Sequence, residues 1–315
     1  MKKPNAVLIA GPTGVGKTET SVLLAKKLNT EIISCDSMQI YRGMDIGTAK
    51  VTEEEKQGIV HHMIDILDIN EQFSVCDYVE RASKIVLQLA SAGKTALVVG
   101  GTGLYADSLF KGIDFSPNAS ADEDYRKKMY ELFEKEGAEY IHSLLKEADS
   151  ESAEAIHPNN VKRVIRALEY YHATGEKISD YNKKSKSFPT PYNSVRIYFT
   201  RDRESLYERI NRRVDKMISL GLEEEVKKII SSGACPNSTA MQALGYKEMA
   251  EHLEGNCTLE DAIETIKQKS RNYAKRQLTW FKRDPGGIWL NLDEFSSAEQ
   301  VSEKCFEIIK ERGAL

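Results

Sequence analysis

The chain has 315 residues, of which 41% are hydrophobic and 29% charged, and its formal net charge is −4 at pH 7. This is the composition of an ordinary globular protein that can bury a sizeable core. It excludes a membrane-spanning protein, because no stretch approaches the roughly 20 consecutive apolar residues that cross a bilayer. The small net charge also means that a polyanionic partner would have to bind to local basic patches.

Cysteine usage and the N-terminal residues indicate the compartment. The N-terminus runs into a short apolar strand and lacks the apolar core of a signal peptide. His61 and His62 have no partner at metal-ligand spacing, so we expect them to be structural. We therefore predict a cytoplasmic protein without zinc, and a monomer is the default expectation. The cysteines, which form no C-x-x-C pair and should be reduced, are Cys35, Cys76, Cys235, Cys257 and Cys305.

Five short apolar runs, rich in β-branched residues, predict strands separated by stretches of helical periodicity. Strands that alternate with helices are typical of a parallel sheet covered by helices. The predicted fold class is therefore α/β, with a parallel sheet flanked by helices. The runs are residues 6–10, 31–35, 63–66, 95–99 and 195–200.

Strand signals are absent between residues 116 and 194, which predicts an all-helical insertion there. The core would then consist of residues 1–115 and 195–315. The helical patterns of the insertion lie at 125–136, 138–147 and 160–173, before a linker at 188–191. Further patterns lie at 203–219, 223–231, 243–252 and 259–282, followed by a strand at 288–292 and a C-terminal helix ending at Gly313.

A phosphate-binding motif follows the first predicted strand and precedes a helical run. Gly14 and Gly16 allow backbone N–H groups to converge on oxygen atoms, Lys17 adds a cation, and the Thr18 hydroxyl can bind Mg²⁺. The motif predicts a P-loop, which fits a nucleoside triphosphate and the diphosphate of another substrate alike. Its residues, Gly11-Pro12-Thr13-Gly14-Val15-Gly16-Lys17-Thr18, match the pattern G-x-x-x-x-G-K-[ST].

A carboxylate follows the second predicted strand. Asp36 would lie beside the P-loop at the carboxyl end of the sheet, where ligands of open α/β sheets bind. In a phosphotransferase it would take a proton from a hydroxyl, and in another transferase from an attacking amine. The alternative is that Asp36 is an N-cap or turn residue.

The strand at 95–99 lacks the terminal aspartate expected in a motor protein or GTPase. It continues into glycines that would let the backbone approach a ligand, with Thr102 as a hydrogen-bond donor. A tight strand-to-helix turn explains the spacing equally well. The segment reads Gly100-Gly101-Thr102-Gly103-Leu104-Tyr105.

Cations gather on two predicted helices. Arg209 and Arg213 are four residues apart and share a face, which suits a clamp on diphosphate or a contact with RNA phosphate. The alternative is a solvated face paired with Glu208 and Asp215. The helix at 259–282 interleaves cations with aromatic residues, which predicts RNA contact, unless the aromatic residues are core and the cations merely solvated. These residues are Lys267, Lys269, Arg271, Tyr273, Lys275, Arg276, Trp280, Phe281, Lys282 and Arg283.

Taken together, these motifs resemble the bacterial tRNA dimethylallyltransferase family, also called tRNA isopentenyltransferases or IPP transferases. In the P-loop, Gly14-Val15 occupies the two positions where Ala-Ser is usual in the bacterial family, but Gly16 is kept. The resemblance rests on the P-loop and on the run Asp36-Ser37-Met38-Gln39-Ile40-Tyr41-Arg42-Gly43-Met44-Asp45-Ile46-Gly47-Thr48-Ala49-Lys50. It is extended in family order by His61-His62-Met63-Ile64-Asp65, Ile156-His157-Pro158-Asn159-Asn160, Gly245-Tyr246 and Tyr273-Ala274-Lys275-Arg276-Gln277-Leu278-Thr279-Trp280.

The resemblance implies transfer of a dimethylallyl group from dimethylallyl diphosphate to N6 of the tRNA adenosine just 3′ of the anticodon, adenosine 37. The P-loop and Mg²⁺, bound at Thr18, would hold the diphosphate, and Asp36 would be the base on the adenine amine. Lys17, Thr102, Arg209 and Arg213 complete the predicted catalytic set. The residues expected to bind tRNA are Asp36, Ser37, Met38, Gln39, Thr102, Lys162, Arg163, Val164, Ile165, Arg166, Gln242, Gly245, Tyr246, Lys247, Lys275 and Arg276.

A small-molecule or nucleoside kinase that uses ATP is the alternative function. It explains the P-loop and Asp36, but it gives no role to residues 36–50 or to the helical insertion. A non-catalytic RNA-binding module is disfavoured, because Lys17, Thr18 and Asp36 together resemble a working site.

Overall fold

The computed structural model describes residues 3–112, 122–186 and 190–315. The chain divides into two compact units: unit 1 comprises Met1–Phe110 and Pro191–Leu315, and unit 2 comprises Lys111–Thr190. The predicted insertion, 116–194, overlaps unit 2 but ends four residues after it. Its last two residues, 193 and 194, belong to a strand of unit 1. None of the helices within the described residues is both long and apolar enough to cross a membrane.

A six-stranded sheet forms the centre of unit 1, in the order β3-β2-β4-β1-β5-β6, and every neighbouring pair is parallel. The first strand, β1 (Asn5–Ala10), lies between β4 (Ala96–Gly100) and β5 (Asn193–Thr200). The predicted α/β class is therefore confirmed. The other strands are β2 (Ile32–Cys35), β3 (His61–His62) and β6 (Ile288–Asn291), and the short 3-10 helix η2 (Leu292–Glu294) follows β6.

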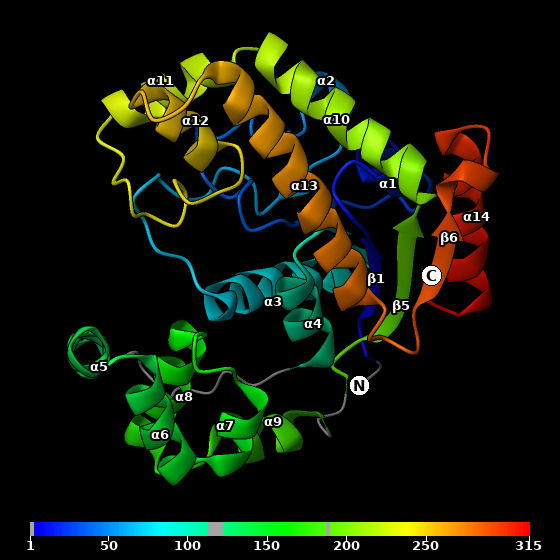
Figure 1. Ribbon diagram of the computed structural model, residues 1–315. Helices are drawn as coiled ribbons and strands as arrows, with labels where there is room; N and C mark the ends of the chain where they lie inside the picture. The colour runs from blue at the N-terminus through cyan, green and yellow to red at the C-terminus, as the bar shows by residue number, and fades with distance from the viewer. Residues whose placement is uncertain (1–2, 113–121, 187–189) are drawn as a thin grey trace. The chain divides into compact units, whose positions relative to one another are not determined.

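Alternate side chains of β1 enter two separate apolar cores, as the two-residue period of a strand requires. Val7 and Ile9 pack with α1 and α14, whereas Ala6 and Leu8 pack with α3 and α4. Both faces of the sheet are thus covered, and Figure 1 shows α14 beside β6. These helices are α1 (Lys17–Lys27), α3 (Val75–Ser91), α4 (Gly103–Lys111) and α14 (Ala298–Glu311).

Four further helices of unit 1 build a third apolar cluster with the segment 38–49. The carboxylate of Glu225 accepts hydrogen bonds from the backbone N–H groups of Asp45, Ile46 and Gly47 and from the Tyr246 hydroxyl. One carboxylate therefore fixes this loop. Helices α10 and α13 lie side by side (Figure 1). The helices are α10 (Arg203–Ser219), α11 (Leu222–Ser231), α12 (Tyr246–Leu253) and α13 (Leu259–Phe281), and α2 (Glu53–Lys56) is a single turn.

Unit 2 is helical throughout its described residues and has an apolar core of its own, centred on Met129, Ile141, Leu145 and Leu168. Its short helices α7 and α9 were not predicted, because six to nine residues carry little periodicity. Its helices are α5 (Glu123–Glu136), α6 (Ala138–Ala148), α7 (Ser150–Ala155), α8 (Val161–Thr174) and α9 (Ile178–Lys186).

The strand predicted at 63–66 is wrong, because the structure has only the two-residue strand β3 before it. Met63 and Asp65 have φ angles of 63° and 54°, which no extended strand contains. The apolar pattern that suggested a strand reflects burial instead, since the Met63 side chain packs in the core and is only 3% exposed. The five cysteines form no disulfide bond with one another.

The close approach of β2 and β4 generates a stability prediction. A Cβ on Gly100 would lie 2.1 Å from the carbonyl oxygen of Cys35. The added methyl group would force β2 and β4 apart, and paired strands cannot separate without losing hydrogen bonds. We therefore expect Gly100→Ala to lower the free energy of unfolding, measured by chemical denaturation, by about 1–3 kcal/mol. The control is Gly286→Ala, whose Cβ would meet the flexible end of Arg196 at 2.9 Å. An equal loss in both variants would contradict the argument.

Candidate active site

The predicted P-loop connects β1 to α1 at the carboxyl edge of the sheet. Gly14 and Gly16 have φ angles of 77° and 111°, in the left-handed region that favours glycine. The Lys17 Nζ donates hydrogen bonds to the carbonyl oxygens of Gly11 and Pro12, both at 2.9 Å. The ammonium group is therefore folded over the loop that begins the helix.

Two arginines support the loop from the other side. Arg209 Nε donates to the Gly14 carbonyl at 3.0 Å, and Arg201 Nε donates to the Val15 carbonyl at 2.9 Å. A Cβ on Gly16 would lie 3.7 Å from Nη2 of each arginine, so both guanidinium groups face this glycine. Burial, and then the charge of Arg201, lower the pKa of Arg209. Two cations held this close to a P-loop are suited to binding an anion.

Arg213 joins the same site electrostatically. The pKa of Lys17 is lowered to about 8, mainly by burial and then by the charge of Arg213, whereas the charge of Asp36 opposes both effects. Arg213 Nη2 also donates to the Thr48 carbonyl at 3.1 Å, which ties α10 to the segment 36–50.

The alternative pairing of the two predicted arginines with acidic neighbours is not observed. Glu208 pairs with Arg212 at 3.4 Å, and Asp215 pairs with Lys267 at 2.8 Å. Arg209 and Arg213 therefore face the P-loop and the segment 36–50.

Asp36 follows β2, and its two carboxylate oxygens allow both of its predicted roles, as a turn residue and as a base. Its Oδ1 accepts hydrogen bonds from the backbone N–H groups of Met38 at 2.9 Å and Gln39 at 3.4 Å, which is a turn function. Its Oδ2 accepts no hydrogen bond from the described residues, and so one oxygen remains for a substrate. Thr102 lies beside it, because its Oγ1 accepts from the Ser37 N–H at 3.0 Å.

Helix α13 contributes two residues to the site: Tyr273, which the sequence assigned to RNA contact, and Gln277, which it did not assign. The Tyr273 hydroxyl lies near Thr102, and burial, followed by the charge of Asp36, raises the pKa of Tyr273 to about 12. Gln277 is only 6% exposed and bridges the P-loop and the turn after β4. Its Oε1 accepts from the Thr13 N–H at 2.9 Å, and its Nε2 donates to the Gly101 carbonyl at 2.8 Å.

The residues predicted to bind tRNA through α8 separate into two groups. Lys162, Arg163 and Arg166 are exposed on unit 2. Val164 and Ile165 are 1% and 2% exposed in the core of that unit, so their side chains are not on its surface, and their contact with tRNA stays a prediction. A continuous run was assigned, whereas only one face of a helix reaches the surface.

The same distinction applies to the segment near residue 245. Gln242 and Lys247 are exposed, whereas Tyr246 is fully buried and donates its hydroxyl to Glu225 at 2.6 Å. The Tyr246 side chain is therefore part of the core, and its contact with tRNA stays a prediction. The Gly245 N–H is likewise occupied, since it donates to Glu248 at 2.7 Å.

On α13, the structure leaves part of the predicted basic surface available. Lys275 and Arg276 are exposed, and the Arg276 guanidinium lies 5.6 Å from the centre of the Tyr273 ring. Phe281 is 2% exposed and belongs to the core, which favours the alternative that this aromatic side chain is a core residue. Two cations closer to the N-terminus of α13 form ion pairs within the protein: Lys267 with Asp215 and Glu264, and Lys269 with Glu248.

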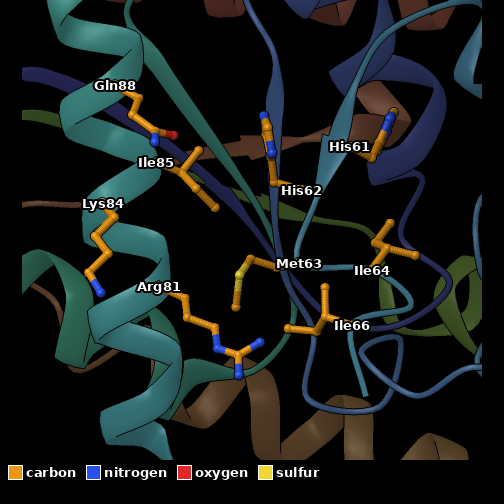
Figure 2. Close-up of a pocket in the computed structure, with 9 residues that line it drawn as sticks. All are labelled: His61, His62, Met63, Ile64, Ile66, Arg81, Lys84, Ile85 and Gln88. Atoms are coloured by element: carbon orange, nitrogen blue, oxygen red, sulfur yellow. The ribbon is translucent and has the colours of Figure 1, made fainter. Parts of the chain in front are cut away.

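A hollow of about 410 Å³ lies away from these residues, between α3 and the segment 61–66. Figure 2 shows Arg81, Lys84 and Ile85 on the helix side and Met63 on the other. At its edge, His62 Nε2 lies 2.7 Å from Glu31, which also pairs with Lys94, and His61 Nδ1 lies 2.9 Å from the Ile59 carbonyl oxygen. These histidines contact protein groups, and the described residues contain no cluster of three or more His, Cys, Asp or Glu that could hold a metal.

The fold and the site define the class: an α/β protein with a P-loop at the carboxyl edge of a parallel sheet. Residues 39–284 match the family model described as IPP transferase, and the chain belongs to this family. This membership confirms the resemblance that the motifs indicated.

Curated relatives and solved structures agree with the family. The chain is 45% identical to a tRNA dimethylallyltransferase of Lachnoclostridium phytofermentans, over 97% of each chain. It is 46% identical to that of Halalkalibacterium halodurans, over 96% of this chain and 95% of the relative. The fold is similar to a tRNA isopentenylpyrophosphate transferase from Bacillus halodurans (TM-score 0.73, 44% identity, 99% and 98% of the two chains). It is also similar to a eukaryotic dimethylallyltransferase acting on tRNA (TM-score 0.84, 29% identity, 98% of this chain and 79% of that one).

The charges around Lys17 generate a titration prediction. The rate at which an amine-reactive reagent acylates Lys17 can be followed by peptide mass spectrometry. This rate should rise with increasing pH, with a midpoint near pH 8, because the pKa of Lys17 is lowered to about 8. Arg213→Gln removes a repelling cation and should move the midpoint to higher pH, whereas Asp36→Asn removes an attracting anion and should move it lower. An unchanged midpoint in both variants would contradict this electrostatic coupling.

Proposed function

We propose that this protein transfers a dimethylallyl group from dimethylallyl diphosphate to N6 of adenosine 37 in tRNA, giving N6-dimethylallyladenosine and diphosphate. The observation that carries the proposal is a phosphate loop surrounded by cations beside a carboxylate with one oxygen available. The activity that the relatives' names give, dimethylallyl transfer to tRNA, supports the proposal.

Asp36 would serve the acceptor. An exocyclic adenine amine is a weak nucleophile, because its lone pair is delocalised into the ring. A carboxylate that accepts an amine proton raises its nucleophilicity as the new C–N bond forms. The hydrogen bonds from Met38 and Gln39 to Oδ1 hold the side chain in place, while Oδ2 would receive the proton.

The cations would serve the leaving group. Negative charge accumulates on the diphosphate as the allylic C–O bond breaks, so Lys17, Arg209 and the loop N–H groups would stabilise the transition state more than the ground state. The Thr18 hydroxyl is exposed at the start of α1 and makes no hydrogen bond to the described residues, which fits a ligand of Mg²⁺. Such an ion would neutralise diphosphate charge, with water and phosphate oxygens completing its coordination.

Exposed cations would bind the RNA. Lys275 and Arg276 lie on the same helix as Tyr273, whose hydroxyl reaches Thr102 beside Asp36. The target adenine cannot react while it is stacked in the anticodon loop, so we infer that it is turned out of the stack toward Asp36. Lys162, Arg163 and Arg166 provide a second exposed basic surface on unit 2.

The test is a transfer assay without ATP. Purified protein is incubated with Mg²⁺, dimethylallyl diphosphate and an unmodified anticodon stem-loop, and mass spectrometry detects the product. The addition of one five-carbon unit at adenosine 37 is expected. If no unit is added, but phosphate is transferred from ATP to a small acceptor, the kinase alternative is correct.

In that assay, Asp36→Asn should slow single-turnover transfer by about 10²-fold or more, because the base is lost. Asparagine keeps a side-chain oxygen for the turn, so the local fold should survive and tRNA binding should be unchanged. Asp215→Asn, a change in a surface ion pair with Lys267, is the matched control. Equal transfer rates for Asp36→Asn and the wild type would remove Asp36 from the mechanism.

Arg276→Ala should weaken tRNA binding and reduce the slope of log affinity against log salt by about 1, as expected when one phosphate contact is lost. Filter binding at several salt concentrations measures both quantities. Lys310→Ala, an exposed cation on α14, is the control and should leave the slope unchanged. A slope unaffected by Arg276→Ala would show that this side chain only covers the Tyr273 ring.

A further inference from the structure

Helix α13 docks on the turn after β4 through side chains on successive helical turns. The Tyr273 hydroxyl lies near Thr102, Gln277 donates to the Gly101 carbonyl, and Trp280 packs on Gly103. The two glycines are needed for this contact. A Cβ would lie 2.3 Å from Gln277 Nε2 at Gly101 and 2.4 Å from Trp280 Cδ1 at Gly103.

Gln277 differs from its neighbours because it also reaches the P-loop. Its amide uses the donor for the Gly101 carbonyl (2.8 Å) and the acceptor for the Thr13 N–H (2.9 Å). A neutral side chain that both donates and accepts is required, since one of the two backbone groups is a donor and the other is an acceptor. The pairing of β1 with β4 ends at Ala10 and Gly100, so this amide links the two loops just beyond the sheet.

The two loops carry different parts of the proposed chemistry. The P-loop would hold the diphosphate, whereas the turn after β4 carries Thr102, which hydrogen-bonds to Ser37 beside the proposed base. The separation of these loops therefore sets the distance between the allylic carbon and the amine nitrogen. Reactant groups must approach to about 3–3.5 Å, and a misplacement of about 1 Å costs roughly 10²-fold in rate.

We propose that Gln277 is a positioning residue that fixes the separation of the diphosphate loop and the acceptor side. This inference rests on the proposed function. The amide oxygen and nitrogen of Gln277 are both used by the backbones of Thr13 and Gly101, so Gln277 would act through these two loops. A purely structural role is a poorer explanation, because the strands and the Thr102 N–H to Cys35 carbonyl bond (3.1 Å) already hold the turn against the sheet.

The test compares Gln277→Met, which keeps the length but removes both hydrogen bonds, with Gln277→Glu, which keeps only the acceptor. Gln268→Met, at an exposed position of the same helix, is the matched control. Turnover per folded molecule is measured with the stem-loop substrate, alongside KM for each substrate and the unfolding temperature. Both Gln277 variants should lower kcat by about 10-fold or more, with the KM for RNA within about threefold of wild type.

Hydrogen exchange of the P-loop peptide, with inorganic diphosphate bound, provides a readout that needs no turnover. Exchange at residues 11–18 should be faster in Gln277→Met than in wild type and Gln268→Met, because the Thr13 N–H loses its acceptor. Wild-type transfer tests the proposed function separately from this comparison. Unchanged kcat together with unchanged exchange would overturn the inference. So would loss of folding in both Gln277 variants, or activity that falls only in proportion to the folded fraction.

Discussion

The parallel alignment of the strands is the constraint on which the site depends. Because every strand of the sheet runs in one direction, the segments that follow β1, β2, β4 and β5 emerge at one edge. They carry the P-loop, Asp36, Thr102 and Arg201 respectively, although Lys17 and Arg201 are far apart in the sequence. The residues are brought together by backbone hydrogen bonds in the sheet, and side chains then adjust their positions.

Electrostatics explains why this edge favours an anion. Lys17, Arg201, Arg209 and Arg213 lie around one loop, and their mutual repulsion contributes to the lowered pKa values of Lys17 and Arg209. Such an arrangement opposes folding unless backbone carbonyls and a carboxylate offset the repulsion. Here the carbonyls of the P-loop accept from three of the cations, and Asp36 lies close enough to favour the charged forms of Lys17 and Arg213. A bound diphosphate would complete this balance.

The sequence predicted the parts of the site that belong to local motifs. The P-loop and Asp36 were found because glycine spacing and the end of an apolar strand are visible within a few residues. Gln277 and Arg201 were missed because their partners lie 264 and 186 residues away along the chain. The burial of Tyr246 was not predicted although its motif was recognised, because burial depends on the packing of Glu225 and Gly47 around the ring, which no local pattern contains.

The separate core of unit 2 has a consequence for any measurement of stability. Val164, Ile165 and Leu168 are buried among residues of their own unit, and the two chain segments that form unit 1 bury their apolar residues in other clusters. Units whose apolar clusters have no residue in common need not melt together, so heating the protein is expected to give two overlapping transitions. A single midpoint would then describe neither unit. A substitution in the core of α8 is expected to unfold unit 2 while the phosphate loop of unit 1 stays folded.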